Sequence, residues 1–366
     1  MSAQRSILFL IPSLATRGAE RALVNLANHL DKQKYQITVQ TLFDVGELRQ
    51  ALAPEIEYRG GLPFVVRGNV FLLKLFSPAF LYRTIVGRRY DVVVAYLEGT
   101  VTRIISGCPY SDSRKIAWVH TSFTTAHDFS YCYQNLTEAI SSYVAYDRIV
   151  CVSETVRKSI AGWVDGSMTI IHNFVDASQI QTLAKEDIEI AFPNSTPNLL
   201  FVGSLEQNKG IDRLLAVHHR LLQDGHPHHL FVIGDGPLAG RLKKQEQSSP
   251  TVHILGLQQN PYKYMQQADL YVCASYREGL SYTIIEAMLL SKPVVSSACG
   301  GPLELLGENS EYGLLTPNSE QGLYDGILKM LSNPTLMQHY STRSAERARQ
   351  FSQSNVIAQH DKLFEK

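Results

Sequence analysis

Two glutamates stand on either side of a hydroxyl-rich stretch in residues 276–288, which read YREGLSYTIIEAM. On one regular helix, Glu278 and Glu286 would be about 80° apart around the axis and about 12 Å apart along it, which is awkward for binding one small group. If Glu278 instead lies in the loop that enters the helix, both carboxylates could line one side of an elongated ligand. The spacing therefore favours a long, polar ligand.

The same stretch could also bind an anion. Backbone N–H groups at the start of the expected helix, near Gly279 to Tyr282, would form an anion site without any side chain. Lys209, in the sequence VGSLEQNKG, follows an expected strand, where its ammonium group could neutralise a phosphate. A diphosphate would then lie between Lys209 and the helix start. Glu286 would accept hydrogen bonds from ribose hydroxyls, and Glu278 would face a sugar or another polar group beyond the diphosphate.

Glycine-containing turns follow further expected strands. VIGDGPL (232–238) and CGGP (299–302) are two of them. Glycine lets backbone approach a ligand closely because it has no side chain. These turns are expected at the same edge of a sheet as Lys209.

Short apolar runs alternate with helix-period segments in two series along the chain. Runs that are apolar on both faces of the pleat are typical of buried parallel strands, and their alternation with helices predicts doubly wound α/β sheets. The expected strands lie in residues 6–13, 35–43, 90–97, 115–120 and 147–153 of the first series, and in 198–205, 228–236, 251–256, 269–275, 292–298 and 312–316 of the second.

The length of 366 residues predicts two domains, since a domain usually has about 100–200 residues. A polar, proline-containing stretch (183–197) separates the two series. We therefore predict an N-terminal Rossmann-like domain over 1–182, a C-terminal Rossmann-like domain over 183–345, and a final helix over 346–366 that packs back on the N-terminal domain. If the two domains face each other, the cleft between them is the expected ligand site.

Composition excludes several classes of protein. Basic and acidic residues balance at 34 each, so no overall field attracts nucleic acid. Five scattered cysteines form neither a disulfide framework nor a zinc motif, which is typical of a reducing cytosol. The first apolar run is too short for a signal peptide, and no run reaches the roughly 20 residues of a membrane span. We expect a cytoplasmic protein without a nucleic-acid partner.

Residues 60–91 combine large apolar side chains with basic ones and contain no acidic residue before Asp91. Such a segment could lie on an anionic membrane surface, which would make the protein peripheral on the inner face of the plasma membrane. A helix packed in the core with a basic outer face is the alternative. The basic residues are Arg67, Lys74, Arg83, Arg88 and Arg89.

Histidines are concentrated in the stretch HHRLLQDGHPHH. Their spacing is irregular and they flank the end of an expected helix. We interpret them as part of a solvated surface rather than a metal site.

The block over 260–306 resembles the retaining nucleotide-sugar glycosyltransferases of GT-B fold, family four (glycosyl transferases group 1), of the type found in bacterial polysaccharide biosynthesis. Glu278 to Glu286 matches the Glu-x7-Glu signature of that family. The resemblance is dense from about residue 198 onward. In the first half it rests on LATRGAERALVNLA (14–27), WVH (118–120), CVSETVRKSI (151–160) and IHNFVD (171–176).

The resemblance implies roles for single residues. Glu286 would hold the ribose, and Glu278 would bind hydroxyls of the transferred sugar. Lys209 would balance the charge of the leaving diphosphate. His120 would line the sugar site, and Gly18, in a loop before the first helix, would let backbone approach the diphosphate or the acceptor. Glu278, Lys209 and His120 are thus the expected catalytic residues.

The first domain would bind the acceptor and the second the nucleotide sugar. The family uses no metal, and no Asp-x-Asp motif follows a strand here, so neither a metal nor another cofactor is expected. The expected donor-binding residues are Gly18, Ser204, Lys209, Gly234, Gly256, Glu278, Gly279, Leu280, Ser281 and Glu286.

The chain departs from the pattern of the family at two positions. Ser204 stands where an arginine is usual, so phosphate binding must depend more on Lys209 or Arg277. Arg17 stands where a pair of glycines is common. Either change could alter the donor or reduce activity.

The resemblance implies transfer of a hexosyl group from a UDP-sugar to a hydroxyl of a glycan or a lipid-linked acceptor, with retained configuration, in cell-surface polysaccharide assembly. Two alternatives remain open. One is a UDP-sugar epimerase of similar fold, and the other is a non-catalytic, glycosyltransferase-like partner subunit. A nicotinamide dehydrogenase is disfavoured because no G-x-G-x-x-G follows the first strand.

Overall fold

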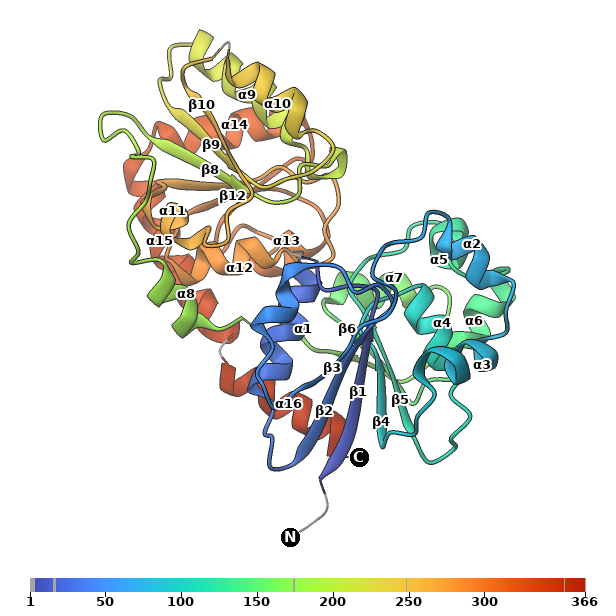
Figure 1. The fold of residues 1–366 in the computed structure, drawn as a ribbon. Helices are drawn as coiled ribbons and strands as arrows, with labels where there is room; N and C mark the ends of the chain where they lie inside the picture. Colours follow the sequence, from blue (N-terminus) through green and yellow to red (C-terminus); the bar gives the residue numbers. More distant parts are fainter. Residues whose placement is uncertain (1–3, 16–17, 174, 248, 352, 366) are drawn as a thin grey trace. The chain divides into compact units, whose positions relative to one another are not determined.

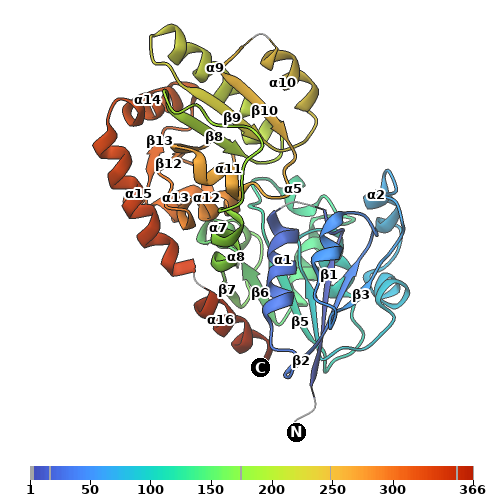
Figure 2. The ribbon, with the colours of Figure 1, turned by 60° about the vertical axis from the view of Figure 1, so that its left-hand side comes forward.

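The computed structural model describes residues 4–15, 18–173, 175–247, 249–351 and 353–365. The chain divides into two compact units, each with its own parallel sheet (Figures 1 and 2). Unit 1 consists of Met1–Phe174 and Ser354–Lys366, and unit 2 consists of Val175–Gln353. The predicted fold class of two Rossmann-like units is confirmed.

The sheet of unit 1 has seven parallel strands in the order β3-β2-β1-β4-β5-β6-β7. The side chains from Ile7 to Ile11 on β1 are all buried, as expected for a strand that is covered on both faces. The strands are β1 (Arg5–Ile11), β2 (Tyr35–Thr41), β3 (Glu57–Arg59), β4 (Val92–Ala95), β5 (Arg114–Val119), β6 (Arg148–Cys151) and β7 (Met168–Ile170).

The helix α16 completes unit 1 although it comes from the far end of the chain. Phe364 makes edge-to-face contacts with Phe9 and Tyr35, at ring-centroid distances of 5.9 and 6.0 Å. The helices of unit 1 are α1 (Gly18–His29), α2 (Asn69–Lys74), α3 (Pro78–Leu81), α4 (Thr100–Ser106), α5 (Ala126–Ser130), α6 (Leu136–Val144), α7 (Glu154–Ala161) and α16 (Gln353–Glu365), with a 3-10 turn η1 (Glu47–Ala51) and a π turn η2 (Tyr82–Val86).

The sheet of unit 2 has six parallel strands in the order β10-β9-β8-β11-β12-β13. They are β8 (Asn198–Val202), β9 (His229–Ile233), β10 (Val252–Gly256), β11 (Leu270–Cys273), β12 (Val294–Ser297) and β13 (Leu314–Thr316). Its helices are α8 (Ala177–Leu183), α9 (Ile211–Gln223), α10 (Ala239–Glu246), α11 (Tyr262–Gln267), α12 (Tyr282–Leu289), α13 (Gly300–Leu306), α14 (Glu320–Leu331) and α15 (Pro334–Ala348), with 3-10 turns η3 (Gln207–Lys209) and η4 (Arg349–Phe351).

Each sheet has a switch point, where the order of the strands reverses. In unit 1 this point lies between β1 and β4, and in unit 2 it lies between β8 and β11. The loops that leave the carboxyl ends of two such strands run to opposite faces of the sheet, and ligands of open α/β sheets bind at this point. The loops after β8 and β11 carry Lys209 and Glu278.

Every run expected as a strand contains one, but two strands were not predicted. These are β3 and β7, which have three residues each and lie at the two edges of the first sheet. Short edge strands need few apolar residues, so their sequences carry little signal.

The chain passes between the units at other positions than predicted. The first unit ends at Phe174 rather than at residue 182, because α8 packs against α11 and α12 of unit 2. The stretch 183–197 also belongs to unit 2. Its Phe192 stacks on Phe231 at 3.7 Å between ring centroids, and Lys263 donates to its Glu189 at 2.6 Å.

The final segment is likewise not one helix over 346–366. The helix α15 runs to Ala348 within unit 2, where Arg347 donates to the carbonyl oxygens of Glu304 and Leu305. The return to unit 1 begins at Ser354.

The interpretation of the histidine stretch as a solvated surface is wrong for two of its members. His218 and His228 are buried, and Nδ1 of His218 lies 2.8 Å from Nε2 of His228. The hydroxyl of Thr251 lies 3.0 Å from Nε2 of His218. His218 on α9 and His228 just before β9 thus pack their rings into the unit.

Candidate active site

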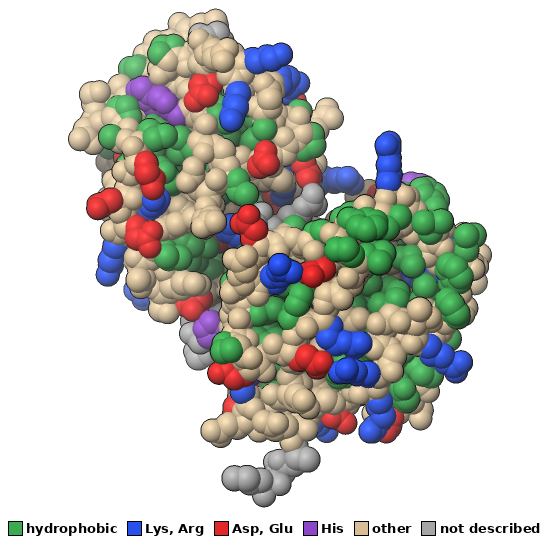
Figure 3. All heavy atoms as spheres, in the orientation of Figure 1, with side chains coloured by type: hydrophobic (Ala, Val, Ile, Leu, Met, Phe, Trp, Pro, Cys, Tyr) green, Lys and Arg blue, Asp and Glu red, His purple; other side chains and the backbone are tan. Residues whose placement is uncertain are grey.

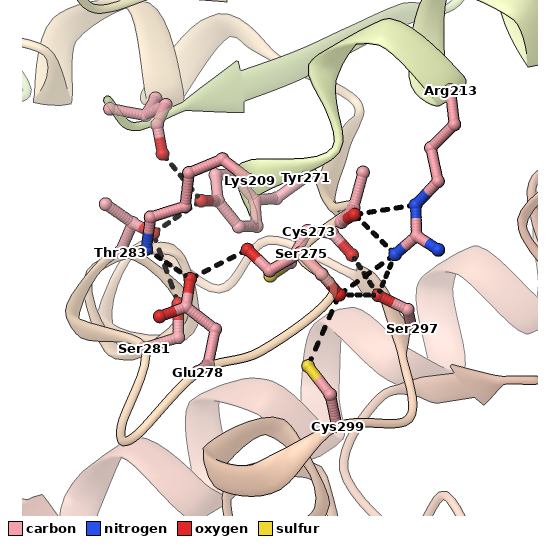
Figure 4. Close-up of polar contacts among 12 residues, drawn as sticks. Lys209, Arg213, Tyr271, Cys273, Ser275, Glu278, Ser281, Thr283, Ser297 and Cys299 are labelled. Carbon is pink, nitrogen blue, oxygen red and sulfur yellow. Dashed lines mark hydrogen bonds and ion pairs between the residues drawn. The ribbon is translucent and has the colours of Figure 1, made fainter. Parts of the chain in front are cut away.

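Glu278 lies in the loop between β11 and α12, as the spacing of the two glutamates predicted. Its Oε1 accepts hydrogen bonds from Lys209 Nζ at 2.7 Å and from Ser275 Oγ at 2.8 Å (Figure 4). The two charged side chains are largely buried, with 23% of Lys209 and 13% of Glu278 exposed. Two expected catalytic residues that are 69 positions apart in the sequence therefore form one ion pair.

The turn η3 and Gly210 bring Lys209 to this position. Gly210 has a φ of 67°, and a Cβ on it would lie 2.0 Å from the carbonyl oxygen of Ala274. Tyr276 N–H also donates to Asn208 O at 2.8 Å. The loop after β8 is thus pressed against the loop after β11, a contact that only glycine permits.

Lys209 is a full positive charge at neutral pH. Burial by itself lowers the pKa of an ammonium group. At Lys209, however, the charge of Glu278 and the hydrogen bond to it outweigh burial, and the pKa is raised above its ordinary value. The site therefore holds a fixed cation next to a carboxylate.

Arg213, which sequence analysis missed, holds the backbone of this loop. Its buried guanidinium donates from Nε to Ala274 O at 2.8 Å and from Nη2 to Ser275 O at 2.9 Å. The same group lies over the ring of Tyr276, 3.9 Å from the centroid. An arginine in the first turn of an amphipathic helix gives no sequence signal for this role, since most such residues are solvated. Arg213 positions the loop that carries Glu278.

Glu286 lies in the second turn of α12 and is only 1% exposed. The hydroxyl of Tyr262 donates to its Oε1 at 2.9 Å. A buried carboxylate needs such donors to offset the loss of hydration. The structure thus places one predicted glutamate in the entering loop and the other inside the helix.

The start of α12 differs from those of α7 and α14, which also have a serine at the N-cap position. Ser281 occupies the N-cap position, but over the described residues its side chain makes no capping bond and lies 3.4 Å from the hydroxyl of Thr283. By contrast, the serines before α7 and α14, Ser153 and Ser319, each accept a backbone N–H. The first turn of α12 is therefore not closed by its own N-cap side chain.

The CGGP turn supports the loop before α12 from the other side. Gly301 N–H donates to Glu278 O at 3.0 Å. A Cβ on Gly301 would lie 2.6 Å from Leu280 Cα and 2.7 Å from Gly279 O. Leu280 and Ser281 are buried, whereas Gly279 is half-buried. Close packing of backbone against backbone fixes this loop.

The expected glycines of the other turns lie at neighbouring strand ends. Gly234 N–H donates to Gly256 O at 2.9 Å, and Gly203 N–H donates to Ile233 O at 3.0 Å. Gly234 has a φ of 147°, and a Cβ on it would lie 1.9 Å from Gly203 O. Ser204 follows Gly203 and is half-buried. At the ends of β8, β9 and β10, backbone thus packs closely against backbone.

His120 and Gly18 belong to unit 1, whereas the other predicted residues belong to unit 2. Gly18 is the first residue of α1 rather than part of a loop before it. Arg17 lies outside the described residues.

His120 directly follows β5. Its backbone N–H donates to Glu98 Oε2 at 2.9 Å, and its ring lies 5.0 Å from that of Tyr96. Within the described parts of the chain, neither ring nitrogen has a hydrogen-bond partner. Burial lowers the pKa of His120 to about 3, so the ring is neutral at physiological pH. A neutral imidazole can donate one hydrogen bond and accept another.

In the part of the chain that the structure describes, no cluster of three or more His, Cys, Asp or Glu side chains is arranged to hold a metal ion.

Comparison with known proteins identifies the family. Residues 196–333 match the family model described as Glycosyl transferases group 1, and residues 16–179 match the model described as Glycosyltransferase Family 4. The two models together extend over most of both units.

Two relatives illustrate the range of similarity. An N-acetylgalactosamine-N,N'-diacetylbacillosaminyl-diphospho-undecaprenol 4-alpha-N-acetylgalactosaminyltransferase of Campylobacter jejuni is 31% identical over 192 residues, and the alignment covers 51% of this chain and 50% of that protein. The chain thus spans about half the length of this curated relative. The lipopolysaccharide core biosynthesis glycosyltransferase LpsD of Rhizobium meliloti is 22% identical over 360 residues, 95% of each chain.

A solved structure with the same fold is Anabaena Alr3699/HepE in complex with UDP and glucose. It superposes with a TM-score of 0.78 at 19% identity and covers 99% of this chain and 100% of the other. At this identity the likeness shows the fold alone, which is the GT-B arrangement of two parallel-sheet units. From the two family models and this fold, the chain belongs to the group 1 glycosyl transferases of family 4.

Proposed function

We propose that the protein transfers a hexosyl group from a UDP-sugar to a hydroxyl of a glycan or a lipid-linked acceptor in cell-surface polysaccharide assembly, with retained configuration and without a metal ion. Membership of the family supports transfer of a sugar. The complex of the Anabaena protein with UDP and glucose supports a UDP-sugar donor. The name of the Campylobacter relative supports a lipid-linked acceptor, since that protein acts on a diphospho-undecaprenol compound.

The observation that carries the proposal is the buried pair of Lys209 and Glu278 at the switch point of unit 2. An ammonium group has three donors, so Lys209 can keep its bond to Glu278 and also bind a phosphate oxygen. The start of α12, which is not capped by Ser281, provides a second attraction for the diphosphate. The cation and the helix start would together stabilise the diphosphate as it leaves.

Recognition of the donor would use both glutamates. Glu286 would accept hydrogen bonds from the ribose, with Tyr262 holding its carboxylate in place. Glu278 would bind hydroxyls of the sugar, because Ser275 and Lys209 fix one of its oxygens. The neutral ring of His120 would bind the sugar from unit 1.

Glu278 is assigned to hydroxyl binding and is therefore not placed as a nucleophile of the kind that retaining glycosidases use. In the proposed step, the bond between the anomeric carbon and the phosphate oxygen breaks. The acceptor oxygen forms its bond to that carbon on the same face, and its proton passes to the leaving phosphate. The chain would contribute orientation and stabilisation of the departing charge.

The test is a donor screen on the purified protein. UDP-glucose, UDP-galactose and their N-acetylated counterparts are each added, and binding is measured as a rise in melting temperature. UDP release is then followed with and without a polyprenyl-diphosphate sugar acceptor, in the presence and absence of EDTA, and the anomeric configuration of the product is read by NMR.

The outcomes separate the alternatives. A transferase releases UDP in proportion to the glycosylated acceptor, and α product from α donor establishes retention. An epimerase converts the donor into another UDP-sugar without acceptor. A partner subunit releases no UDP until a second protein is added. Binding of none of the nucleotide sugars would refute the proposed donor site.

A further inference from the structure

The segment that contains α2 and α3 presents its large apolar side chains to solvent. Leu75 is 75% exposed, more than any other large hydrophobic residue among those described. Folded proteins rarely expose a contiguous apolar surface of this kind without a partner for it. We call this surface the apolar face. Its exposed side chains are Leu62, Phe64, Val65, Phe71, Leu72, Leu75, Phe76 and Phe80.

Figure 3 shows hydrophobic side chains gathered on the part of unit 1 where α2 lies, with basic side chains nearby. The core helix with a basic outer face, which the sequence left open, describes only the end of the segment, where Leu81, Tyr82 and Val86 are buried and Arg83 is exposed. From Leu62 to Phe80 no side chain is fully buried and eight large apolar side chains are exposed, whereas burial resumes at Leu81.

The backbone beneath the apolar face is firmly held. Arg103, 1% exposed, donates to Leu73 O at 2.9 Å and to Phe76 O at 2.7 Å. Glu138 neutralises the guanidinium at 2.7 Å. A buried arginine is costly unless it is paired in this way. Arg103 therefore fixes the backbone at the end of α2, which keeps the apolar side chains of this segment exposed.

All the charged side chains of residues 58–90 are basic. The segment has no acidic residue between Glu57 and Asp91. Arg88 and Arg89 are paired with Glu57 and Asp112, respectively.

The remaining cations of the segment are available to an external anion. Among the described residues, neither Arg67, Lys74 nor Arg83 forms an ion pair. Lys74 Nζ lies over the rings of Phe71 and Tyr131, at 5.4 and 5.5 Å from their centroids. Unpaired cations are thus interleaved with exposed aromatic rings.

We infer that the apolar face docks on the surface of an anionic lipid bilayer. Phe71, Leu72 and Leu75 would enter the boundary between headgroups and acyl chains, and the cations would meet lipid phosphates. No helix in the described residues is long and apolar enough to cross a bilayer, so the contact would be a surface one. A protein partner would need acidic groups to match the unpaired cations, whereas an anionic bilayer supplies them everywhere.

The inference goes beyond sugar transfer, and its test needs no donor. Full-length protein is sedimented with vesicles of phosphatidylcholine alone and with vesicles that also contain phosphatidylglycerol. We expect co-sedimentation with the anionic vesicles at low salt and a clear reduction at high salt, since salt screens the cations. A failure of UDP-sugar binding would leave this result unaffected.

Two sets of variants locate the contact. Replacing Arg67, Lys74 and Arg83 by glutamine should weaken vesicle binding about fivefold per residue, or about a hundredfold together. Phe71→Ser with Leu75→Ser should weaken it at least tenfold. The matched controls are in unit 2: Arg241, Lys243 and Lys244 to glutamine, and Ile190→Ser with Leu257→Ser. These should bind as the unchanged protein does.

Melting curves and circular dichroism show whether each variant is folded. Equal binding by the patch variants and the controls would overturn the inference, as would absence of binding by the unchanged protein. A concentration-dependent dimer without lipid, lost in Phe71→Ser with Leu75→Ser, would assign the apolar face to self-association and would equally overturn it.

Discussion

Glu278 in unit 2 and His120 in unit 1 both follow the carboxyl end of a parallel strand, but their surroundings differ. Glu278 accepts hydrogen bonds from Lys209 and Ser275, and Arg213 fixes the loop that carries it. Both ring nitrogens of His120 are buried without a partner among the described residues. Buried polar groups are normally paired, and an exception requires an explanation.

Under the proposed function, the two residues would meet the donor in different ways. The site of unit 2 has its charges and loops in place within the unit itself, which reduces the cost of ordering them on binding. His120 instead has its backbone fixed, through Glu98, while its ring remains to be bonded. We expect the donor to bind to unit 2 with little rearrangement and to provide a partner for His120.

The substitution Lys209→Ala should have the largest effect on activity. It removes the cation that faces the leaving diphosphate and leaves Glu278 with Ser275 alone. We expect kcat to fall by about 10²–10³-fold, as on loss of one preorganised donor to a developing charge. The measurement is UDP release at saturating donor.

Lys243→Ala, on the exposed side of α10, is the matched control and should keep the rate. An unchanged kcat in Lys209→Ala would show that the pair with Glu278 is structural only.

The second test is Glu286→Ala, which removes the buried carboxylate held by Tyr262. A hydrogen bond to a charged group contributes about 1.5–3 kcal/mol, so the donor KM should rise by about 10–100-fold. Tyr262→Phe keeps the carboxylate and should cause a smaller rise. If both variants bind UDP as the unchanged protein does, Glu286 does not contact the ribose.

A third test concerns unit 1. His120→Phe should lower kcat by about tenfold, because the neutral ring can form at most two uncharged hydrogen bonds with the sugar, donating one and accepting the other. Since the pKa of His120 is lowered to about 3, its ring stays neutral from mildly acidic to basic pH. The pH profile of kcat should therefore keep its shape in the variant. A step near pH 6.5 that disappears in His120→Phe would contradict the neutral ring.

The smallest expected effect concerns His218, a histidine that is buried like the ring nitrogens of His120 but has hydrogen-bond partners. Burial first, and then neighbouring histidines, lower the pKa of His218 to about 3. The pKa of a histidine in the unfolded chain is about 6.5. As the pH falls below this pKa, the unfolded chain binds a proton at His218 while the folded protein does not, so the free energy of unfolding decreases. At about pH 6 this amounts to about 0.8 kcal/mol.

Urea unfolding at pH 7.5 and pH 6 measures this loss. In His218→Gln the loss on acidification should be smaller by about that amount. The variant is also expected to be less stable at both pH values, since it loses the contacts with His228 and Thr251. The same decrease on acidification in both proteins would show that His218 is not a neutral, buried group.

The main strands and the Glu-x7-Glu pair could be predicted because their signals are local. The buried runs are apolar on both faces, and a glutamate inside the apolar turn of α12 stands out. The ion pair of Lys209 with Glu278, by contrast, depends on β8 and β11 being neighbours in the sheet. Only the tertiary structure brings these two loops together.

Other features could not be predicted because tertiary packing decides them. Arg213 was missed by the sequence analysis, yet from inside the unit it donates to the backbone of the loop that contains Ser275. The polar stretch before β8 has the composition of a linker, but Phe192 attaches it to unit 2. His218 faces the interior because of the turn of α9 on which it lies.

The return of α16 to unit 1 has a consequence for biosynthesis. The ring of Phe364 rests on Phe9 and Tyr35, and Arg5 Nη1 donates to Phe364 O at 2.5 Å. The strands β1 and β2 are therefore synthesised well before residues 354–365 can cover them, with all of unit 2 made in between. Until then a strip of aromatic surface on the earliest sheet is uncovered, during the period when nascent chains are most exposed to aggregation.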